Sequence, residues 1–131
     1  MGVFCVAKKL EIYKCDKCGN VVEVFVGGDG ELVCCGEPMK LLDEKSGEGA
    51  GEKHLPVIVP QGGGILVKVG SIAHPMDPDH WIQFIEVVRK DGKTGRQDLN
   101  PGEKPEAYFS IKPGEVLQVR SLCNKHGLWS K

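Results

Sequence analysis

Nine residues of this 131-residue chain have the side chains and the spacing of metal ligands, and they form two groups. The first group consists of four cysteines: Cys15, Cys18, Cys34 and Cys35. A Cys-x-x-Cys pair and a later pair of adjacent cysteines offer four thiolates to one tetrahedral ion. Gly19, directly after the first pair, allows the chain to turn back toward that ion. A site with four protein ligands has no open position, so it can hold structure or pass electrons but cannot bind a substrate.

The identity of the ion at these cysteines stays open at this point. Adjacent residues cannot form the chelate loop of a Cys-x-x-Cys pair, so the four sulfur atoms should deviate from ideal tetrahedral angles. Iron and zinc accept the same four thiolates. A disulfide between Cys34 and Cys35, or four buried thiols without a metal, are further alternatives. The six cysteines come without a secretory leader, which favours a reducing, cytoplasmic setting in which cysteines bind metal more often than they pair.

The second group combines every histidine of the chain with one cysteine: His54, His74, His80, Cys123 and His126. Each histidine lies at a strand end or in a loop of the predicted fold, which argues against packed core histidines. Cys123 and His126 flank a short turn closed by Gly127. Five donors exceed the tetrahedral preference of zinc, whereas iron would keep a sixth position open. A thiolate opposite such a position pushes electron density toward a bound oxygen species.

Composition narrows the class of protein that carries these residues. The chain is 40% hydrophobic and 27% charged, as expected of a folded globular protein. Its net charge of -1 gives no electrostatic footprint for nucleic acid. No run of eighteen apolar residues is present, so we expect no membrane-spanning helix.

Short strands separated by turn residues must position both groups. Residues 10–39 form a compact cysteine knuckle, and the polar, glycine-rich stretch 43–52 indicates an exposed linker. Beyond it, alternating apolar residues predict strands, and no window has a helical period. The predicted strands are 21–26, 55–60, 65–69, 81–88, 107–111 and 116–122, with 55–60 and 65–69 joined as a hairpin.

These patterns predict an all-β fold: a small metal knuckle followed by an antiparallel, immunoglobulin-like β-sandwich. We place the knuckle at residues 1–42, the linker at 43–53 and the sandwich at 54–131. Cys5 belongs to neither group of ligands, and we expect it to be a small apolar residue of a short strand.

In combination, these motifs resemble desulfoferrodoxin, the two-iron form of superoxide reductase. The resemblance covers residues 10–131 and depends on several ordered motifs. The motifs are Cys15-x-x-Cys18, Cys34-Cys35-Gly36, Glu52-Lys-His-Leu-Pro-Val57, His74-Pro-Met76 with the later His80, and Cys123-Asn-Lys-His-Gly127. Trp81 stands where tyrosine is frequent in the family, which affects none of the ligands.

The resemblance implies a desulforedoxin-like domain that binds iron through Cys15, Cys18, Cys34 and Cys35. It implies a second, catalytic iron with four equatorial histidines and an axial Cys123. Family members also suggest that Glu52 occupies the sixth position in the oxidised state and that Lys53 attracts the anionic substrate. The implied reaction is the one-electron reduction of superoxide to hydrogen peroxide in a cytoplasmic homodimer, with rubredoxin or a similar protein as electron donor.

Two other functions remain compatible with the residues. The chain could be a non-catalytic electron-transfer iron protein, in which neither metal binds a substrate. It could also be an interaction module that is stabilised by zinc at both groups of ligands.

Overall fold

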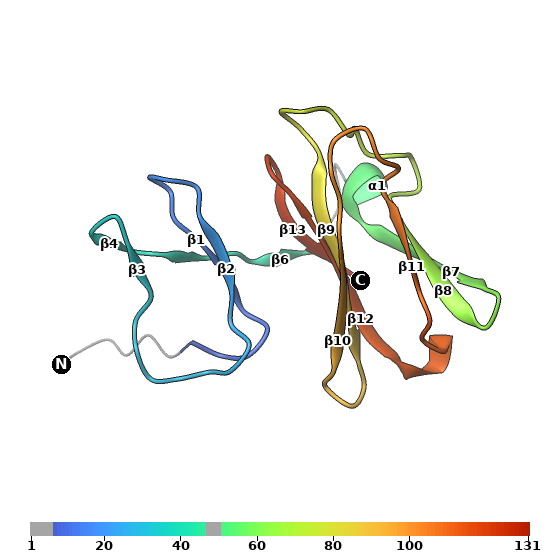
Figure 1. Ribbon diagram of the computed structural model, residues 1–131, viewed down its shortest axis with the longest axis horizontal. Helices are drawn as coiled ribbons and strands as arrows, with labels where there is room; N and C mark the ends of the chain where they lie inside the picture. The colour runs from blue at the N-terminus through green and yellow to red at the C-terminus, as the bar shows by residue number, and fades with distance from the viewer. Residues whose placement is uncertain (1–6, 47–50) are drawn as a thin grey trace. The chain divides into compact units, whose positions relative to one another are not determined.

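The computed structural model describes residues 7–46 and 51–131, except for the side chain of Glu52. The chain divides into two compact units, Met1–Asp43 and Glu44–Lys131, which we describe separately (Figure 1). Cys5 lies outside the described residues, so the expectation that it belongs to a short strand stays a prediction.

The first unit is a small assembly of short strands around the cysteines. Its three-stranded sheet has the order β2-β1-β5, and a separate hairpin consists of β3 and β4. The bounds are β1 Ile12–Lys14, β2 Val21–Glu23, β3 Val33–Cys34, β4 Glu37–Pro38 and β5 Lys40–Leu41. Its buried apolar residues are Ala7, Ile12, Cys15 and Val24. So small a core leaves much of the folding free energy to a bound metal ion.

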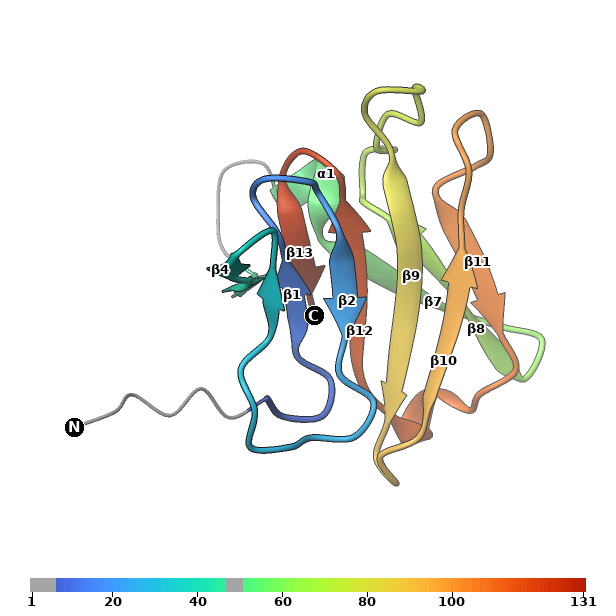
Figure 2. The ribbon, with the colours of Figure 1, turned by 60° about the vertical axis from the view of Figure 1, so that its left-hand side comes forward.

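The second unit is a β-sandwich of a five-stranded sheet, β10-β9-β12-β13-β6, and a three-stranded sheet, β11-β8-β7. Figure 2 shows β9, β10 and β12 in front of β7 and β8. The strands of the larger sheet are β6 Glu44–Lys45, β9 Ile82–Arg89, β10 Thr94–Asp98, β12 Val116–Cys123 and β13 Gly127–Ser130. The smaller sheet contains β7 Pro56–Gln61, β8 Gly64–Val69 and β11 Glu106–Phe109.

Helical structure in the described residues is limited to the single turn α1 Gly51–His54 and the 3-10 turn η1 Pro113–Glu115. The predicted all-β class, with a small cysteine knuckle followed by a β-sandwich, is therefore confirmed. Within the described residues, no helix is long and apolar enough to cross a membrane.

The core of the sandwich lies between its two sheets and includes Ile65, Val67, Ile85, Val87 and Val119. The strand predicted at residues 81–88 is confirmed as β9, an inner strand of its sheet that is hydrogen-bonded to β10 on one side and β12 on the other. The opposite face of β9 is also buried. Glu86 lies on that face, and its side chain pairs there with Arg120 of β12.

The predicted hairpin of residues 55–60 and 65–69 is confirmed as β7 and β8, which pair from Pro56↔Val69 to Gln61↔Gly64. Gly62 and Gly63 form its loop with φ values of 56° and 82°. A two-residue loop with two positive φ angles matches the right-handed twist of the strands, and glycine adopts such angles without strain.

Several stretches differ from the sequence-based prediction, and β13 at the end of the chain is one of the strands that were not predicted. β10 adds a strand where none is predicted, because its sequence Thr-Gly-Arg-Gln-Asp is polar and mostly exposed. The predicted strand 21–26 ends at Glu23. Glu44 and Lys45 lie in the predicted linker, yet they form β6, which pairs in parallel with β13.

Candidate metal centres

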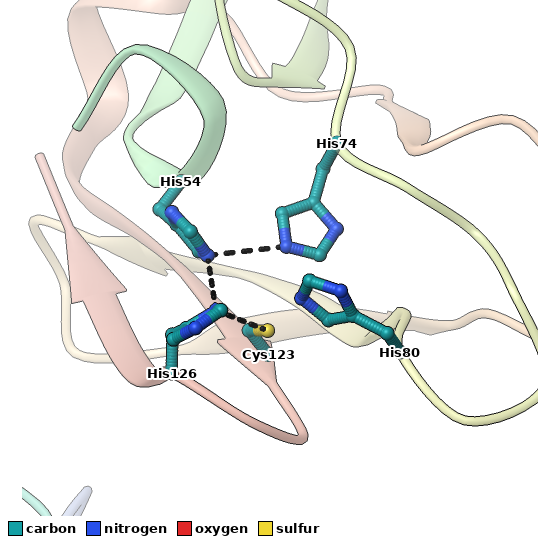
Figure 3. Close-up of side chains that lie close together, drawn as sticks. All are labelled: His54, His74, His80, Cys123 and His126. Carbon is teal, nitrogen blue, oxygen red and sulfur yellow. Dashed lines mark hydrogen bonds between the residues drawn. The ribbon is translucent and has the colours of Figure 1, made fainter. Parts of the chain in front are cut away.

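The five predicted ligands of the second group come together at one end of the sandwich (Figure 3). His54 ends α1, and Cys123 ends β12. His74 and His80 lie in the connection between β8 and β9, and His126 lies in the turn between β12 and β13. Their ligand atoms all lie within 4.8 Å of one another, although the residues are up to 72 positions apart in the chain.

The imidazole rings converge on a common centre. His54 Nε2 lies 3.2 Å from His74 Nε2 and 3.1 Å from His126 Nδ1. Cys123 Sγ lies 3.7 Å from His126 Nδ1. In Figure 3 the four rings and the sulfur atom point toward one another. His126 therefore presents Nδ1 to the centre, whereas His54 and His74 present Nε2.

His74 is held in the ligating form by its surroundings. Its side chain is buried, and its Nδ1–H donates to the carbonyl oxygen of Pro75 at 2.7 Å, which leaves the lone pair on Nε2. Burial lowers the pKa of His74 to about 4, because the charged ring would lose its hydration. The ring is therefore neutral at pH 7, as metal binding requires.

His80 supplies the observation that tests whether a metal fits here. Its Nε2 atom is buried and has no hydrogen-bond partner among the described residues. A buried polar atom without a partner costs roughly 1–3 kcal/mol. A metal ion bound to the five converging atoms would remove this cost, so the residues present fit such an ion.

Neighbouring side chains fix the loops that carry the ligands. Ser121 Oγ donates to the carbonyl oxygen of His54 at 3.2 Å. Asn124, which lies between Cys123 and His126, accepts a hydrogen bond from the Trp81 backbone N–H at 2.9 Å. Its own Nδ2 donates to the carbonyl oxygen of Asp79 at 2.9 Å. Asn124 thus connects the loop that carries His80 to the turn that carries His126. The sequence alone does not indicate this role, because asparagine is a common residue in turns.

The two residues expected to act on the substrate precede His54 on α1. Lys53 is exposed to solvent. The backbone of Glu52 belongs to α1, but its side chain lies outside the described part of the structure.

The four cysteines of the first group also come together, with sulfur atoms within 4.8 Å of one another. Cys18 Sγ lies 3.5 Å from Cys34 Sγ, which lies 3.9 Å from Cys35 Sγ. All four are free cysteines, so Cys34 and Cys35 do not form the alternative disulfide. Cys35 has a φ of 54° in the turn between β3 and β4, which lets two adjacent cysteines face the same centre.

Electrostatics shows that this cluster suits a cation. The backbone N–H of Cys18 is the main group that lowers the pKa of the Cys15 thiol, to about 7. Hydrogen bonding with Cys18 is the main cause that raises the pKa of Cys35 to about 12. Thiols this close cannot all ionise, because each thiolate opposes the next. A metal ion at their centre would remove that conflict, so the four cysteines fit a thiolate-bound metal.

Comparisons with known proteins agree with both centres. The desulfoferrodoxin N-terminal domain model matches residues 7–42, and the desulfoferrodoxin model matches residues 46–131. The desulfoferrodoxin of Syntrophotalea carbinolica is 59% identical over 124 residues, which cover 95% of this chain and 97% of that protein. The desulfoferrodoxin of Nitratidesulfovibrio vulgaris is 55% identical, covering 91% of this chain and 93% of that one.

A solved structure gives the same result. The superoxide reductase from Treponema pallidum superposes with a TM-score of 0.73 at 29% identity, and the match covers 94% of this chain and 97% of that chain. Both family models, the relatives and the fold lead to one conclusion: the chain belongs to the desulfoferrodoxin family.

Proposed function

We propose that the chain is a superoxide reductase whose catalytic iron is bound by His54, His74, His80, Cys123 and His126. The observation that carries this proposal is the convergence of five ligand atoms within 4.8 Å. One of them, His80 Nε2, is buried and has no hydrogen-bond partner in the described part of the chain. Membership of the desulfoferrodoxin family, and the likeness to a solved superoxide reductase, support the same function.

The reaction is the addition of one electron and two protons to superoxide, which gives hydrogen peroxide. When bound, ferrous iron supplies the electron, and five protein ligands leave one of its six preferred positions open to the substrate. An external donor would then reduce the ferric centre again. Because the electron does not come from a second superoxide, no dioxygen is formed, in contrast to dismutation.

The protein residues prepare the centre for this chemistry. Burial keeps the His74 ring neutral, and the hydrogen bond to the Pro75 carbonyl holds its proton on Nδ1, which leaves Nε2 free to bind. Cys123 is buried at the end of β12, where its thiolate would donate electron density to the metal. Four neutral imidazoles and one thiolate add a single negative charge, so a ferrous centre keeps a net positive charge that favours an anionic substrate.

Glu52 and Lys53 complete the proposed catalytic machinery. We propose that the carboxylate of Glu52 would bind the metal in its oxidised state. Lys53 steers superoxide toward the centre, and its exposure on α1 suits that role because steering depends on a charge that the diffusing substrate can sense.

The first centre is proposed to hold iron through Cys15, Cys18, Cys34 and Cys35 and to pass electrons. We propose domain bounds of 1–42 and 54–131, with 43–53 as the connection. The remaining proposals are a cytoplasmic homodimer and an electron donor of the rubredoxin type.

A direct test is to react the reduced, iron-loaded chain with superoxide from pulse radiolysis and to measure peroxide and dioxygen. A superoxide reductase gives one peroxide for each superoxide consumed and oxidises its second iron without releasing dioxygen. Dioxygen release would indicate dismutation. No reaction, together with a second iron whose spectrum does not respond to azide, would indicate a pure electron carrier and contradict the proposal.

The matched control for this test uses the two centres of the same chain. Cys18→Ser should remove the first iron and leave single-turnover reduction of superoxide in place. His80→Ala should abolish that reduction while the spectrum of the first iron persists. The opposite pattern would assign the activity to the four-cysteine centre.

A further inference from the structure

The backbone of the ligand His126 is held by two residues that are not ligands themselves. The carbonyl oxygen of His126 accepts a hydrogen bond from Lys45 Nζ at 2.9 Å and another from Trp129 Nε1 at 3.1 Å. Trp129 is buried, whereas Lys45 is exposed. Two donors on one carbonyl restrict the peptide plane that joins His126 to Gly127.

The same two residues also reach a second ligand. The Trp129 ring stacks against the ring of His54, with centroids 4.8 Å apart and an interplanar angle of 21°. Lys45 Nζ lies 5.7 Å from the centroid of the Trp129 ring, within the range of a cation–π interaction. Lys45, Trp129 and His54 therefore form a continuous contact from the surface to the metal centre.

Lys45 reaches this position because β6 is attached to the sandwich. Trp129↔Lys45 and Leu128↔Glu44 are the parallel pairs between β13 and β6. The carboxylate of Glu44 accepts hydrogen bonds from Arg120 Nη1 at 2.9 Å and from Gln118 Nε2 at 2.7 Å. Glu44 and Lys45 lie between the two family-model matches, 7–42 and 46–131, so neither match includes these residues.

We propose that Lys45 and Trp129 are a positioning pair for the second iron: they fix His126 and His54, and the Lys45 ammonium raises the reduction potential of the centre. A nearby cation favours the ferrous form, which carries one positive charge less than the ferric form. The inference rests on the proposed function only in that His54, His74, His80, Cys123 and His126 bind iron.

The first experiment measures the midpoint potential of the second iron in Lys45→Met, Lys45→Arg and the control Lys68→Met. Lys68 is also exposed, but it lies on β8 of the other sheet. We expect Lys45→Met to lower the potential, Lys45→Arg to retain most of the wild-type value, and Lys68→Met to change it little. Raising the salt concentration should shrink the difference, because Lys45 is exposed and its charge is screened. A Lys45→Met potential equal to that of the wild type would overturn the electrostatic part.

The second experiment tests positioning in the full-length chain loaded with zinc, which is diamagnetic and independent of redox chemistry. The Gly127 amide nitrogen shares its peptide group with the His126 carbonyl, so its NMR chemical shift reports on both donors. Lys45→Met and Trp129→Phe should each shift this resonance, while Lys68→Met should not. Trp129→Phe keeps a smaller aromatic ring beside His54 and removes the N–H donor.

An unchanged Gly127 resonance in both variants would overturn the positioning role. These outcomes are separate from those of the proposed function. If the wild-type chain fails to reduce superoxide, the proposed function is wrong, but the zinc-form spectra still decide whether Lys45 and Trp129 hold His126. If the wild-type chain is active and the spectra do not change, only the positioning pair is rejected.

Discussion

Cys123 and Gly127 face each other as the last pair of the ladder between β12 and β13. Gly127 has a φ of 86°, and this left-handed conformation closes the turn after three intervening residues. The closure brings Nδ1 of His126 to 3.7 Å from Sγ of Cys123. The Cys-x-x-His spacing can therefore act as a chelate because a glycine follows the histidine.

Replacing Gly127 by alanine should damage the second metal centre and spare the first. A non-glycine residue in the left-handed region costs about 1–2 kcal/mol, and relief of that strain would move His126 away from Cys123. We expect Gly127→Ala to weaken iron binding at the five-residue centre, as measured by metal content and by the optical spectrum after competition with a chelator.

Gly92→Ala is the matched control for this substitution. Gly92 has a φ of 87° in the turn between β9 and β10, and a Cβ atom there would meet nothing within 4 Å. It should lose a similar free energy of unfolding and keep both irons. Equal iron loss in the two variants would mean that the effect of Gly127 is general destabilisation.

The cysteines should separate the two centres spectroscopically. Cys123→Ser replaces a thiolate by a weaker donor, so the absorption of the second iron should be lost or strongly shifted. Superoxide reduction should fall by more than about 10-fold, because loss of a hydrogen-bond partner behind a metal ligand already costs roughly 10- to 100-fold. Cys18→Ser should instead remove only the absorption of the first iron. If Cys123→Ser left both the spectrum and the rate unchanged, Cys123 would not be an iron ligand.

Breaking the buried ion pair between Glu86 and Arg120 should cost more stability than breaking an exposed pair. Glu86 Oε1 accepts from Arg120 Nε at 2.9 Å, and the side chains of this cross-strand pair of β9 and β12 are both buried. Glu86→Gln leaves a buried guanidinium with one carboxylate fewer, so we expect a loss of about 3 kcal/mol in urea unfolding. The control Glu115→Gln removes an exposed partner of Arg89 at 3.2 Å and should cost less than about 1 kcal/mol. Similar costs for the two variants would contradict this account.

Much of the fold follows from local pattern, and the exceptions have physical causes. The hairpin of β7 and β8 was predictable because a glycine pair separates two apolar runs. β9 was predictable because it is a long run of largely apolar, β-branched and aromatic residues. In contrast, β6 depends on long-range contacts of Glu44 with Arg120 and Gln118, which no window of sequence contains.

The same contrast between local sequence pattern and long-range contacts applies to the candidate site. The ligands have distinctive side chains, and their convergence in the structure agrees with their grouping by residue type. Asn124, Lys45 and Trp129 are ordinary residue types whose importance arises from what they contact. The histidine and cysteine ligands can be identified from the sequence because few other residue types bind such metals. The residues that support them can be identified only from the folded structure, because their hydrogen bonds join distant parts of the chain.

Glu52→Ala tests whether this carboxylate reaches the oxidised metal. We expect its reaction with superoxide to proceed at nearly the wild-type rate, because the sixth position is open in the reduced state. The ferric absorption band should shift, since water or hydroxide would replace the carboxylate. An unchanged ferric spectrum would remove Glu52 from the proposed ligand set, and Glu106→Ala, on β11, serves as a control for the loss of one negative charge.

Lys53→Ala should slow the encounter with superoxide without disturbing the metal centre. Removing one exposed positive charge beside the site should lower the second-order rate constant by roughly 3- to 10-fold at low ionic strength, within the range of electrostatic steering. The salt dependence should weaken as well, because less attraction remains to be screened. Stopped-flow or pulse-radiolysis kinetics across a salt series would measure both effects, with Lys68→Ala as an exposed lysine on the other sheet. A rate and a salt dependence equal to those of the wild type would show that Lys53 is an ordinary solvated side chain.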